Sequence, residues 1–229
     1  AWIAFLDDDL AVEPGWLAAI LDAIERYDFD AMFGAISAEF ADPTSYSEVA
    51  DHTFARKTDA PAGIPLAALG RMPQQDFPLS TANCVIRRAA LATMDALFDP
   101  RFGQSGGEDF HFFLRLERGG GRYGWLPNAA CIEAVPPHRC AEEYLLRRYY
   151  AGGQAFAAAM VMTSRFPSAA SLSIAAKASL QLVLHKAIAA LKRDRAAGGK
   201  LREAGIRGKL AWRALHPLYR EEARQLAGE

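Results

Sequence analysis

The chain has 229 residues, a length that suits one large domain or one domain with a helical appendage. Hydrophobic residues make up 51% and charged residues 23%, a balance ample for a buried core and ordinary for a soluble protein. The sequence contains no uncharged apolar run of about 18 residues or more, which argues against a conventional membrane-spanning helix.

The net charge of −1 hides a strong asymmetry along the chain. Residues 1–185 hold 15 Lys and Arg against 22 Asp and Glu, a balance of −7, whereas residues 186–229 hold 11 against 5, a balance of +6. A basic tail on an acidic body predicts an anionic surface as partner, either a membrane or a nucleic acid.

An acidic turn follows the first apolar run. Trp2–Phe5 is rich in aromatic and branched residues, which predicts a buried strand at the centre of a parallel sheet. Leu6-Asp7-Asp8-Asp9-Leu10 comes next, and three adjacent carboxylates repel one another unless a cation lies among them. Hard oxygen ligands suit Mg²⁺ or Mn²⁺, and in open α/β sheets such ligands belong at the carboxyl ends of strands. We therefore expect a divalent metal site here.

A helix, a strand and a long irregular segment are predicted next. Pro14 opens the helix, whose apolar residues recur at helical spacing as far as Ile24, and residues 31–40 form the strand. Seven Pro and Gly residues punctuate residues 41–78, which predicts mostly loop with a short helix near residues 47–56. Long loops of this kind often close over ligands, so we expect this one to cover a ligand.

A second acidic cluster follows a strand over residues 80–88, a helix over 89–97 and a turn. Gly106-Gly107-Glu108-Asp109 begins a helix that ends at Arg118. The glycines permit close approach of a substrate, and a helix N-terminus favours an ionised carboxylate that can act as a base. A plain helix cap with acidic first-turn residues is the alternative.

Two short strands, residues 123–126 and 130–135, and a helix over residues 141–163 complete the predicted body. Cys84, Cys131 and Cys140 are odd in number and lack paired-ligand spacing, which is typical of reduced thiols in a cytosolic protein. A zinc site from Cys131, His138 and Cys140 would lack a nearby fourth ligand, so we do not expect one.

The sequence changes character from Ser168 onward. An apolar stripe and a polar stripe predict a long amphipathic helix; they consist of Leu172, Ala176, Leu180, Leu184, Ile188 and Leu191, and of Lys177, Gln181 and His185. Such a helix can lie in the headgroup layer of an anionic membrane, or its apolar stripe can pack against the domain. The basic stretch has few interleaved aromatic residues, so we expect no nucleic-acid partner.

Together these motifs resemble the family 2 glycosyltransferases of the GT-A fold. Residues 2–9 with residues 14–17 are similar to the metal motif and its following helix, and residues 80–88 to the strand facing the donor sugar. Residues 98–109 are similar to the catalytic-base region. Residues 133–139, Arg147-Arg148 and Gly152-Gly153 most resemble exopolysaccharide enzymes of the succinoglycan glucosyltransferase type.

The resemblance implies an α/β fold, a partial GT-A (Rossmann-like) mixed sheet flanked by helices, with a C-terminal helical extension. Residues 1–165 would hold the metal, the acceptor and the catalytic base, and residues 166–229 would form the basic helical tail. The family's nucleotide-binding half precedes the metal motif. The resemblance therefore implies that the chain is N-terminally truncated and inactive by itself.

The activity implied is a metal-dependent, inverting hexosyl transfer from a nucleotide-sugar donor to a saccharide or lipid-linked acceptor, in exopolysaccharide or cell-surface glycan synthesis. The resemblance places Asp9 on the metal, Asp7 near the ribose or the metal, and Asp109 as the base that deprotonates the acceptor hydroxyl. Glu108 would orient the acceptor or the base. The enzyme would work in the cytoplasm, in peripheral contact with the cytoplasmic face of the inner membrane.

Five further residues each have two interpretations. Many relatives carry a metal-binding His where this chain has Glu133; either Glu133 or His138 completes the metal site, and position favours Glu133. Asn83 either contacts sugar hydroxyls or is a satisfied buried asparagine. Arg147 and Arg148 either bind the diphosphate, whose oxygens suit guanidinium groups, or are surface residues of a helix.

Two other classes of protein are alternatives. Haloacid-dehalogenase-like phosphatases also place two Asp residues after a first strand, but a Thr or Val usually follows two residues after the second, where this chain has Ala11. A non-catalytic binding module is the other alternative, because half an active site can bind without turnover.

Overall fold

The computed structural model describes residues 1–70, 74–192, 197–220 and 222, and it divides into two compact units. The sheet unit comprises residues 1–97 and 112–140, and the helical unit comprises residues 98–111 and 141–229. This division differs from the predicted boundary at residue 165. The helix over residues 142–162 packs with the helices that follow it and so belongs to the helical unit.

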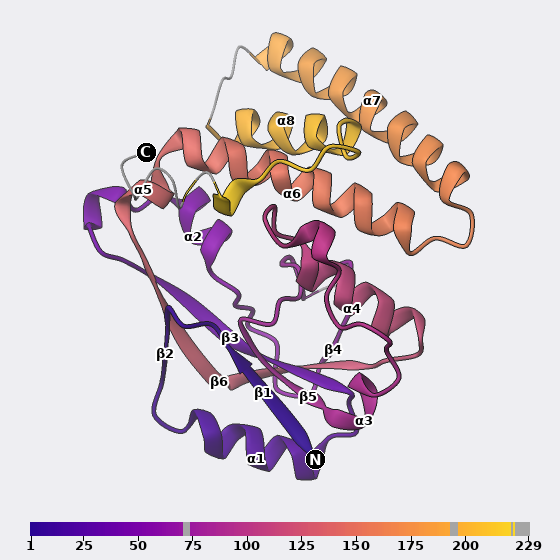
Figure 1. The fold of residues 1–229 in the computed structure, drawn as a ribbon. Helices are drawn as coiled ribbons and strands as arrows, with labels where there is room; N and C mark the ends of the chain where they lie inside the picture. Colours follow the sequence, from indigo (N-terminus) through magenta and orange to yellow (C-terminus); the bar gives the residue numbers. More distant parts are fainter. Residues whose placement is uncertain (71–73, 193–196, 221, 223–229) are drawn as a thin grey trace. The chain divides into compact units, whose positions relative to one another are not determined.

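The sheet unit is built on a mixed sheet flanked by helices (Figure 1). Its strands are β1 (Trp2–Leu6), β2 (Leu10–Val12), β3 (Ala31–Phe40), β4 (Pro65–Leu66), β5 (Asn83–Arg87) and β6 (Tyr123–Val135). Their order is β1-β5-β3-β6-β2, and β4 also pairs with β6. Among these strands β3 and β6 run parallel, and the other pairs run antiparallel. The predicted α/β class with a mixed sheet is confirmed.

The prediction of a parallel pairing is wrong for β1. This strand lies at an edge of the described sheet and pairs antiparallel with β5. Ile3 and Leu6 are 39% and 42% exposed, whereas Trp2 packs against the core and lies under the Arg87 guanidinium. An apolar run of aromatic and branched residues suits a half-buried edge strand as well as a central one, so the pattern alone does not distinguish them.

Helix α1 (Trp16–Arg26) confirms the predicted helix and packs on the sheet. Its buried residues Ile20 and Ala23 contact a core cluster that includes Met32, Val85 and Leu126. The other helical pieces are η1 (Pro43–Ser45), α2 (Glu48–Phe54), α3 (Arg88–Leu91), α5 (Pro137–Cys140) and the later turns of α4 (Glu108–Arg118).

Helix α3 is shorter than the helix predicted over residues 89–97. Helix α3 ends at Leu91, and further along the chain the carbonyl oxygens of Ala96 and Leu97 accept hydrogen bonds from the Arg115 guanidinium. This tertiary contact is not visible in local sequence propensity.

Residues 41–70 and 74–78 contain the short helix that was expected, α2, and are folded onto the sheet. Gly63 N–H donates to Trp125 O at 2.9 Å, and Trp125 N–H donates to Ile64 O at 3.0 Å. The buried Gln75 side chain bonds both the N–H and the carbonyl of Ala67. That this segment covers a ligand stays a prediction, and residues 71–73 lie outside the described residues.

The two short strands predicted after α4 are one strand, β6. It pairs with β3 in two stretches, separated by a register shift between Gly34 and Ile36. A Cβ at Gly34 would overlap Ala129 O and the Asn83 amide, so glycine is required for this close approach. The pairing of β3 with β6 therefore shifts in register at this point, and β6 continues as one strand past it.

The helical unit contains η2 (Pro100–Phe102), the first turn of α4, and three long helices that lie side by side (Figure 1). These are α6 (Glu142–Met162), α7 (Pro167–Lys192) and α8 (Ala197–Leu210). A Cβ at Gly153 of α6 or at Gly208 of α8 would overlap the backbone of the other helix, so glycines allow the two to pack closely. The predicted helix over residues 141–163 is confirmed as α6.

The chain after α8 folds back along α6. The buried side chain of Gln154 donates to Ala211 O and Ala214 O and accepts from His216 N–H at 2.7 Å. One glutamine therefore holds three backbone groups of the C-terminal segment, and an apolar residue at this place would leave them unpaired.

Helix α7 turns its apolar stripe outward. Leu172, Leu180, Leu184 and Ile188 are 73%, 60%, 52% and 51% exposed, and Val183 beside them is 63% exposed. These side chains are therefore not buried within the helical unit. The side chain of Leu191 lies outside the described residues. In the described part of the chain, none of the helices combines the length and the apolar character needed to cross a bilayer.

Candidate active site

The acidic cluster of the sheet unit forms the turn between β1 and β2. Asp7 N–H donates to Ala82 O at 3.0 Å, and Leu10 N–H donates back to Asp7 O at 3.2 Å, which closes a four-residue turn with Asp8 and Asp9 at its corners. All three aspartates are exposed. The fold therefore presents them to solvent at the carboxyl end of β1.

Pairing of β2 with β6 brings a fourth carboxylate to this turn. The register sets Leu10 opposite Glu133, so Glu133 lies beside the residue that follows Asp9. The Arg139 Nη1 atom is 3.3 Å from Asp9 Oδ2 and 4.0 Å from Glu133 Oε1. Both carboxylates thus converge on one cationic nitrogen.

This arrangement suits a hard divalent cation only in part. Asp9 and Glu133 offer carboxylate oxygens around a common point, the donor type that Mg²⁺ and Mn²⁺ prefer. Within residues 1–70, 74–192, 197–220 and 222, however, His, Cys, Asp and Glu side chains form no group of three that could hold a metal. The predicted set of Asp7, Asp9 and Glu133 stays a prediction. His138, the alternative ligand, is exposed on α5.

Asn83 at the start of β5 is a hydrogen-bonding centre of the fold. Its Nδ2 donates to Ala35 O at 3.0 Å and to Ala129 O at 2.8 Å, and its Oδ1 accepts from Trp16 Nε1 at 2.9 Å. The residue is 2% exposed. Both amide protons are used within the protein, so the structure gives Asn83 the role of a satisfied buried asparagine, and contact with a donor sugar stays a prediction.

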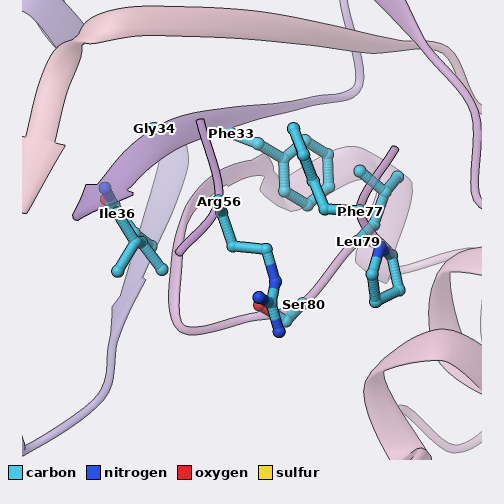
Figure 2. Close-up of a pocket in the computed structure, with 9 residues that line it drawn as sticks. Phe33, Gly34, Ile36, Arg56, Phe77, Leu79 and Ser80 are labelled. Carbon is cyan, nitrogen blue, oxygen red and sulfur yellow. The ribbon is translucent and has the colours of Figure 1, made fainter. Parts of the chain in front are cut away.

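A cavity of about 10 Å³ lies next to Asn83, with room for about one water molecule. Figure 2 shows Phe33, Phe77 and Leu79 beside it and Arg56 reaching toward Ser80. The Arg56 guanidinium already donates to the carbonyls of Thr53 and Ala55 at the end of α2. This cavity is too small for a sugar and is part of the core.

The second acidic cluster lies in the helical unit, where α4 begins. Gly106 and Gly107 have φ values of +76° and +96°, and a Cβ on Gly107 would overlap Ala155 of α6. Two glycines are therefore needed to turn the chain into α4 against α6. His111 stacks on Phe102 with ring centroids 5.1 Å apart, which holds the first turn of α4 to the preceding loop. Glu108 and Asp109 are half-buried in this turn.

The C-terminal segment supplies a residue to this cluster. Tyr219 N–H donates to Gln104 O at 3.1 Å, and the Tyr219 ring lies against Gly106. Partial burial raises the pKa of the Tyr219 hydroxyl; Arg148 lowers this pKa, and Glu108 and Asp109 raise it. Tyr219 and Arg148 therefore share the electrostatic surroundings of the predicted base.

The two predicted arginines of α6 differ in their contacts. Arg147 Nη1 forms an ion pair with Glu143 at 2.9 Å, one turn earlier on the same helix. The positive charge of Arg148 lowers the pKa of the Tyr219 hydroxyl. Their contacts with a diphosphate stay a prediction.

Sequence reasoning missed Arg139 and Tyr219. Arg139 is a basic residue six positions after Glu133, just beyond the end of β6, and its contact with Asp9 spans 130 residues of sequence. Tyr219 lies in the basic C-terminal segment, and nothing local in the sequence connects it to Gly106. Both contacts arise from tertiary folding.

A family of known proteins matches most of this chain. The model of the family described as glycosyl transferase family group 2 matches residues 2–217, and the chain belongs to this family. The chain is 30% identical over 153 residues to the succinoglycan biosynthesis protein ExoM of Rhizobium meliloti (strain 1021), which covers 67% of this chain and 46% of ExoM. The chain thus spans about half the length of this curated relative. No solved structure matches.

Proposed function

We propose that the protein takes part in a metal-dependent, inverting transfer of a sugar from a nucleotide-sugar donor to a saccharide or lipid-linked acceptor, in the synthesis of an exopolysaccharide or another cell-surface glycan. Family membership and the similarity to a succinoglycan biosynthesis protein support this proposal. The observation that carries it is the convergence of Asp9 and Glu133 at the end of β1.

Asp9 and Glu133, with Asp7, would hold Mg²⁺ or Mn²⁺ in place of the Arg139 guanidinium. A bound divalent cation supplies charge stabilisation for a nucleotide diphosphate leaving group. The residues of the chain keep that charge at the carboxyl end of β1, where the turn of Asp7–Leu10 fixes the backbone.

Asp109 would accept the proton of the acceptor hydroxyl. Its place in the first turn of α4 favours the ionised carboxylate, because the helix N-terminus carries partial positive charge. Glu108 would orient the acceptor or the base, and Arg148 adds positive charge to the same surroundings. Because the chain spans 46% of ExoM, we expect transfer to require more of the protein than residues 1–229.

The outward face of α7 would rest on the cytoplasmic face of an anionic membrane. Five large apolar side chains of this face are at least 51% exposed, and the sequence of α7 contains Lys177 and Lys186 but no acidic residue. Apolar burial in the headgroup layer and attraction to anionic lipids act together on such a helix. A lipid-linked acceptor would then lie near the enzyme.

The metal site is tested in the full-length protein, with a nucleotide-sugar donor, membrane acceptors and Mn²⁺. We expect Asp9→Asn and Glu133→Gln each to lower the transfer rate by on the order of 100-fold, because metal charge stabilisation is worth several kcal/mol. Asp22→Asn is the matched control, since Asp22 is exposed on α1 and paired with Arg26. Unchanged transfer in the first two variants would overturn the metal assignment.

The two alternative classes of protein are separated by the family assignment and by this experiment. Membership of a glycosyltransferase family removes the support for a haloacid-dehalogenase-like phosphatase. A non-catalytic binding module is the outcome in which the intact protein binds a nucleotide sugar and transfers nothing.

A further inference from the structure

A groove in the helical unit joins the start of α7 to the end of α8. It has a volume of about 350 Å³, and its lining combines apolar side chains with two serines and two cationic residues. The residues that matter here are Ser168, Ser171 and Leu172 from α7, Lys209 from α8, and Trp212 and Arg213 from the turn that follows. The catalytic motifs do not contribute to it.

The two cations of the groove have no carboxylate partner among the described residues. Neither Lys209 nor Arg213 has an Asp or Glu oxygen of the described chain within 4.0 Å. Lys209 Nζ lies 5.3 Å from the Phe156 ring centroid, and Arg213 Cζ lies 5.0 Å from the Trp212 ring centroid. Burial lowers the pKa of the Lys209 ammonium, and the neighbouring Arg202 lowers it further. An anion bound in the groove would relieve both effects.

The rim of the groove continues into exposed apolar surface. Leu172 is 73% exposed, Leu210 is 38% exposed, and Phe166, just before α7, is 66% exposed. Ser168 and Ser171 also line the groove, and their hydroxyls can donate hydrogen bonds. The groove therefore combines two cations and two hydroxyls with an apolar rim that is continuous with the outward face of α7.

We propose that this groove binds a phosphomonoester or diphosphate group carried on a hydrocarbon chain, that is, the headgroup of an anionic lipid. The phosphate would lie between Lys209 and Arg213, which offer charge-assisted hydrogen bonds, while the chain would run along Leu172. Trp212 suits this place, because its ring is apolar and its N–H is polar, as at membrane interfaces. The inference rests on the proposed membrane contact of α7 and is independent of the proposed transfer chemistry.

The experiment measures binding of residues 1–229 to vesicles by flotation. Phosphatidylcholine vesicles carry, at matched surface charge, phosphatidylglycerol, phosphatidic acid or a polyprenyl monophosphate. Phosphatidylglycerol has a phosphodiester, whereas the other two have an exposed phosphomonoester. We expect tighter binding to both phosphomonoester vesicles than to phosphatidylglycerol vesicles. A further preference for the polyprenyl chain would identify an acceptor-like lipid, and equal binding of the two would identify a bilayer phospholipid as the source.

Lys209→Gln with Arg213→Gln should abolish this preference and weaken binding by about 30-fold, which corresponds to about fivefold for each basic residue near an anionic surface. The matched control is Lys177→Gln with Lys186→Gln, which removes the same charge from α7 outside the groove. We expect the control to weaken binding to all anionic vesicles equally and to keep the preference. Arg213→Gln alone, at an exposed position, replaces the double variant if Lys209→Gln impairs folding.

Three results would overturn the proposal: no preference in the native chain, a preference retained by the groove variant, or full displacement by inorganic phosphate, which would show that the hydrocarbon chain is not recognised. Failure of the sugar-transfer assay leaves these vesicle results unchanged. Loss of all vesicle binding, including that of native protein, would instead refute the membrane contact on which the groove proposal rests.

Discussion

The guanidinium of Arg139 lies 3.3 Å from the carboxylate of Asp9, and the two residues are 130 positions apart in the sequence. The same nitrogen is 4.0 Å from Glu133. An arginine on a four-residue helix, α5, thereby contacts the acidic turn at the end of β1. In the proposed metal-bound state the guanidinium and the metal compete for the same two carboxylates.

Replacing Arg139 tests this competition. We expect Arg139→Gln to raise the affinity of the chain for Mn²⁺ by about fivefold, because an ion pair with a partly exposed partner is worth about 1 kcal/mol at most. Isothermal titration with Mn²⁺ measures the change. Arg26→Gln, which removes an exposed arginine paired with Asp22 at 3.0 Å, should leave the affinity unchanged. Equal or weaker Mn²⁺ binding in Arg139→Gln would contradict the competition.

Asp109 is tested as the base in the full-length protein. Asp109→Asn keeps the size of the side chain and removes its ability to accept a proton, so we expect transfer to fall by about 100- to 10,000-fold while nucleotide binding is kept. Steady-state transfer assays and a nucleotide titration measure the two effects. Asp95→Asn is the control at an exposed position before the turn. Transfer at near the native rate in Asp109→Asn would show that another group takes the proton.

The pair of Asp99 and Arg101 predicts a pH dependence of stability. The Arg101 guanidinium, with its hydrogen bonds to the carboxylate, lowers the pKa of Asp99 from 3.8 to about 2. A lowered folded-state pKa stabilises the protein above about pH 4, and this contribution is lost as the pH falls toward 2. Since Arg101 is 65% exposed, we expect only about 1 kcal/mol at neutral pH.

Urea unfolding from neutral pH down to acid pH measures this contribution in Asp99→Asn, Arg101→Gln and the double variant. The two single variants should lose similar stability at neutral pH, the double variant should lose little more, and all differences from the native chain should shrink in acid. Differences that stay constant with pH would refute the assignment.

We expect replacement of Asn83 by an apolar residue to cause a large loss of stability. Asn83→Leu is close in size but leaves Trp16 Nε1, Ala35 O and Ala129 O without their side-chain partner, which costs about 2–4 kcal/mol. Chemical denaturation of residues 1–229 measures it, and Asn128→Leu, at an exposed asparagine, is the control. If Asn83 served the donor sugar instead, the variant would lose transfer in the full-length protein at unchanged stability.

Residue type and local spacing were enough to find the acidic clusters and most helices. Carboxylates after an apolar run cannot be core, and Gly106-Gly107 before two acids predicts a helix start, so the places of both clusters in the fold follow from the sequence. The roles of Asp9 and Asp109 come from the resemblance to the family and stay predictions. Helices α1, α6 and α7 follow from apolar spacing over many residues. Such features depend on neighbours in the sequence.

The features that sequence reasoning missed depend on partners distant in the chain. Strand β1 pairs antiparallel with β5, and the carbonyl of Leu97 accepts a hydrogen bond from Arg115 of α4. The ion pair of Arg139 with Asp9 has the same origin. For α7 the spacing predicted a long helix, but the exposure of Leu172, Leu180, Leu184 and Ile188 depends on how α7 packs with α6 and α8, which are other parts of the chain.

The outward face of α7 provides the last prediction. Leu180→Glu with Leu184→Glu places two charges where the membrane contact is proposed, at side chains that are 60% and 52% exposed. Because these positions are exposed, we expect the free energy of unfolding to change by less than about 0.5 kcal/mol, while binding to phosphatidylglycerol vesicles is lost. The matched control is Leu17→Glu with Leu21→Glu on α1, at side chains that are 59% and 55% exposed. If both double variants lose vesicle binding equally, the loss reflects added negative charge in general, and the contact does not belong to α7.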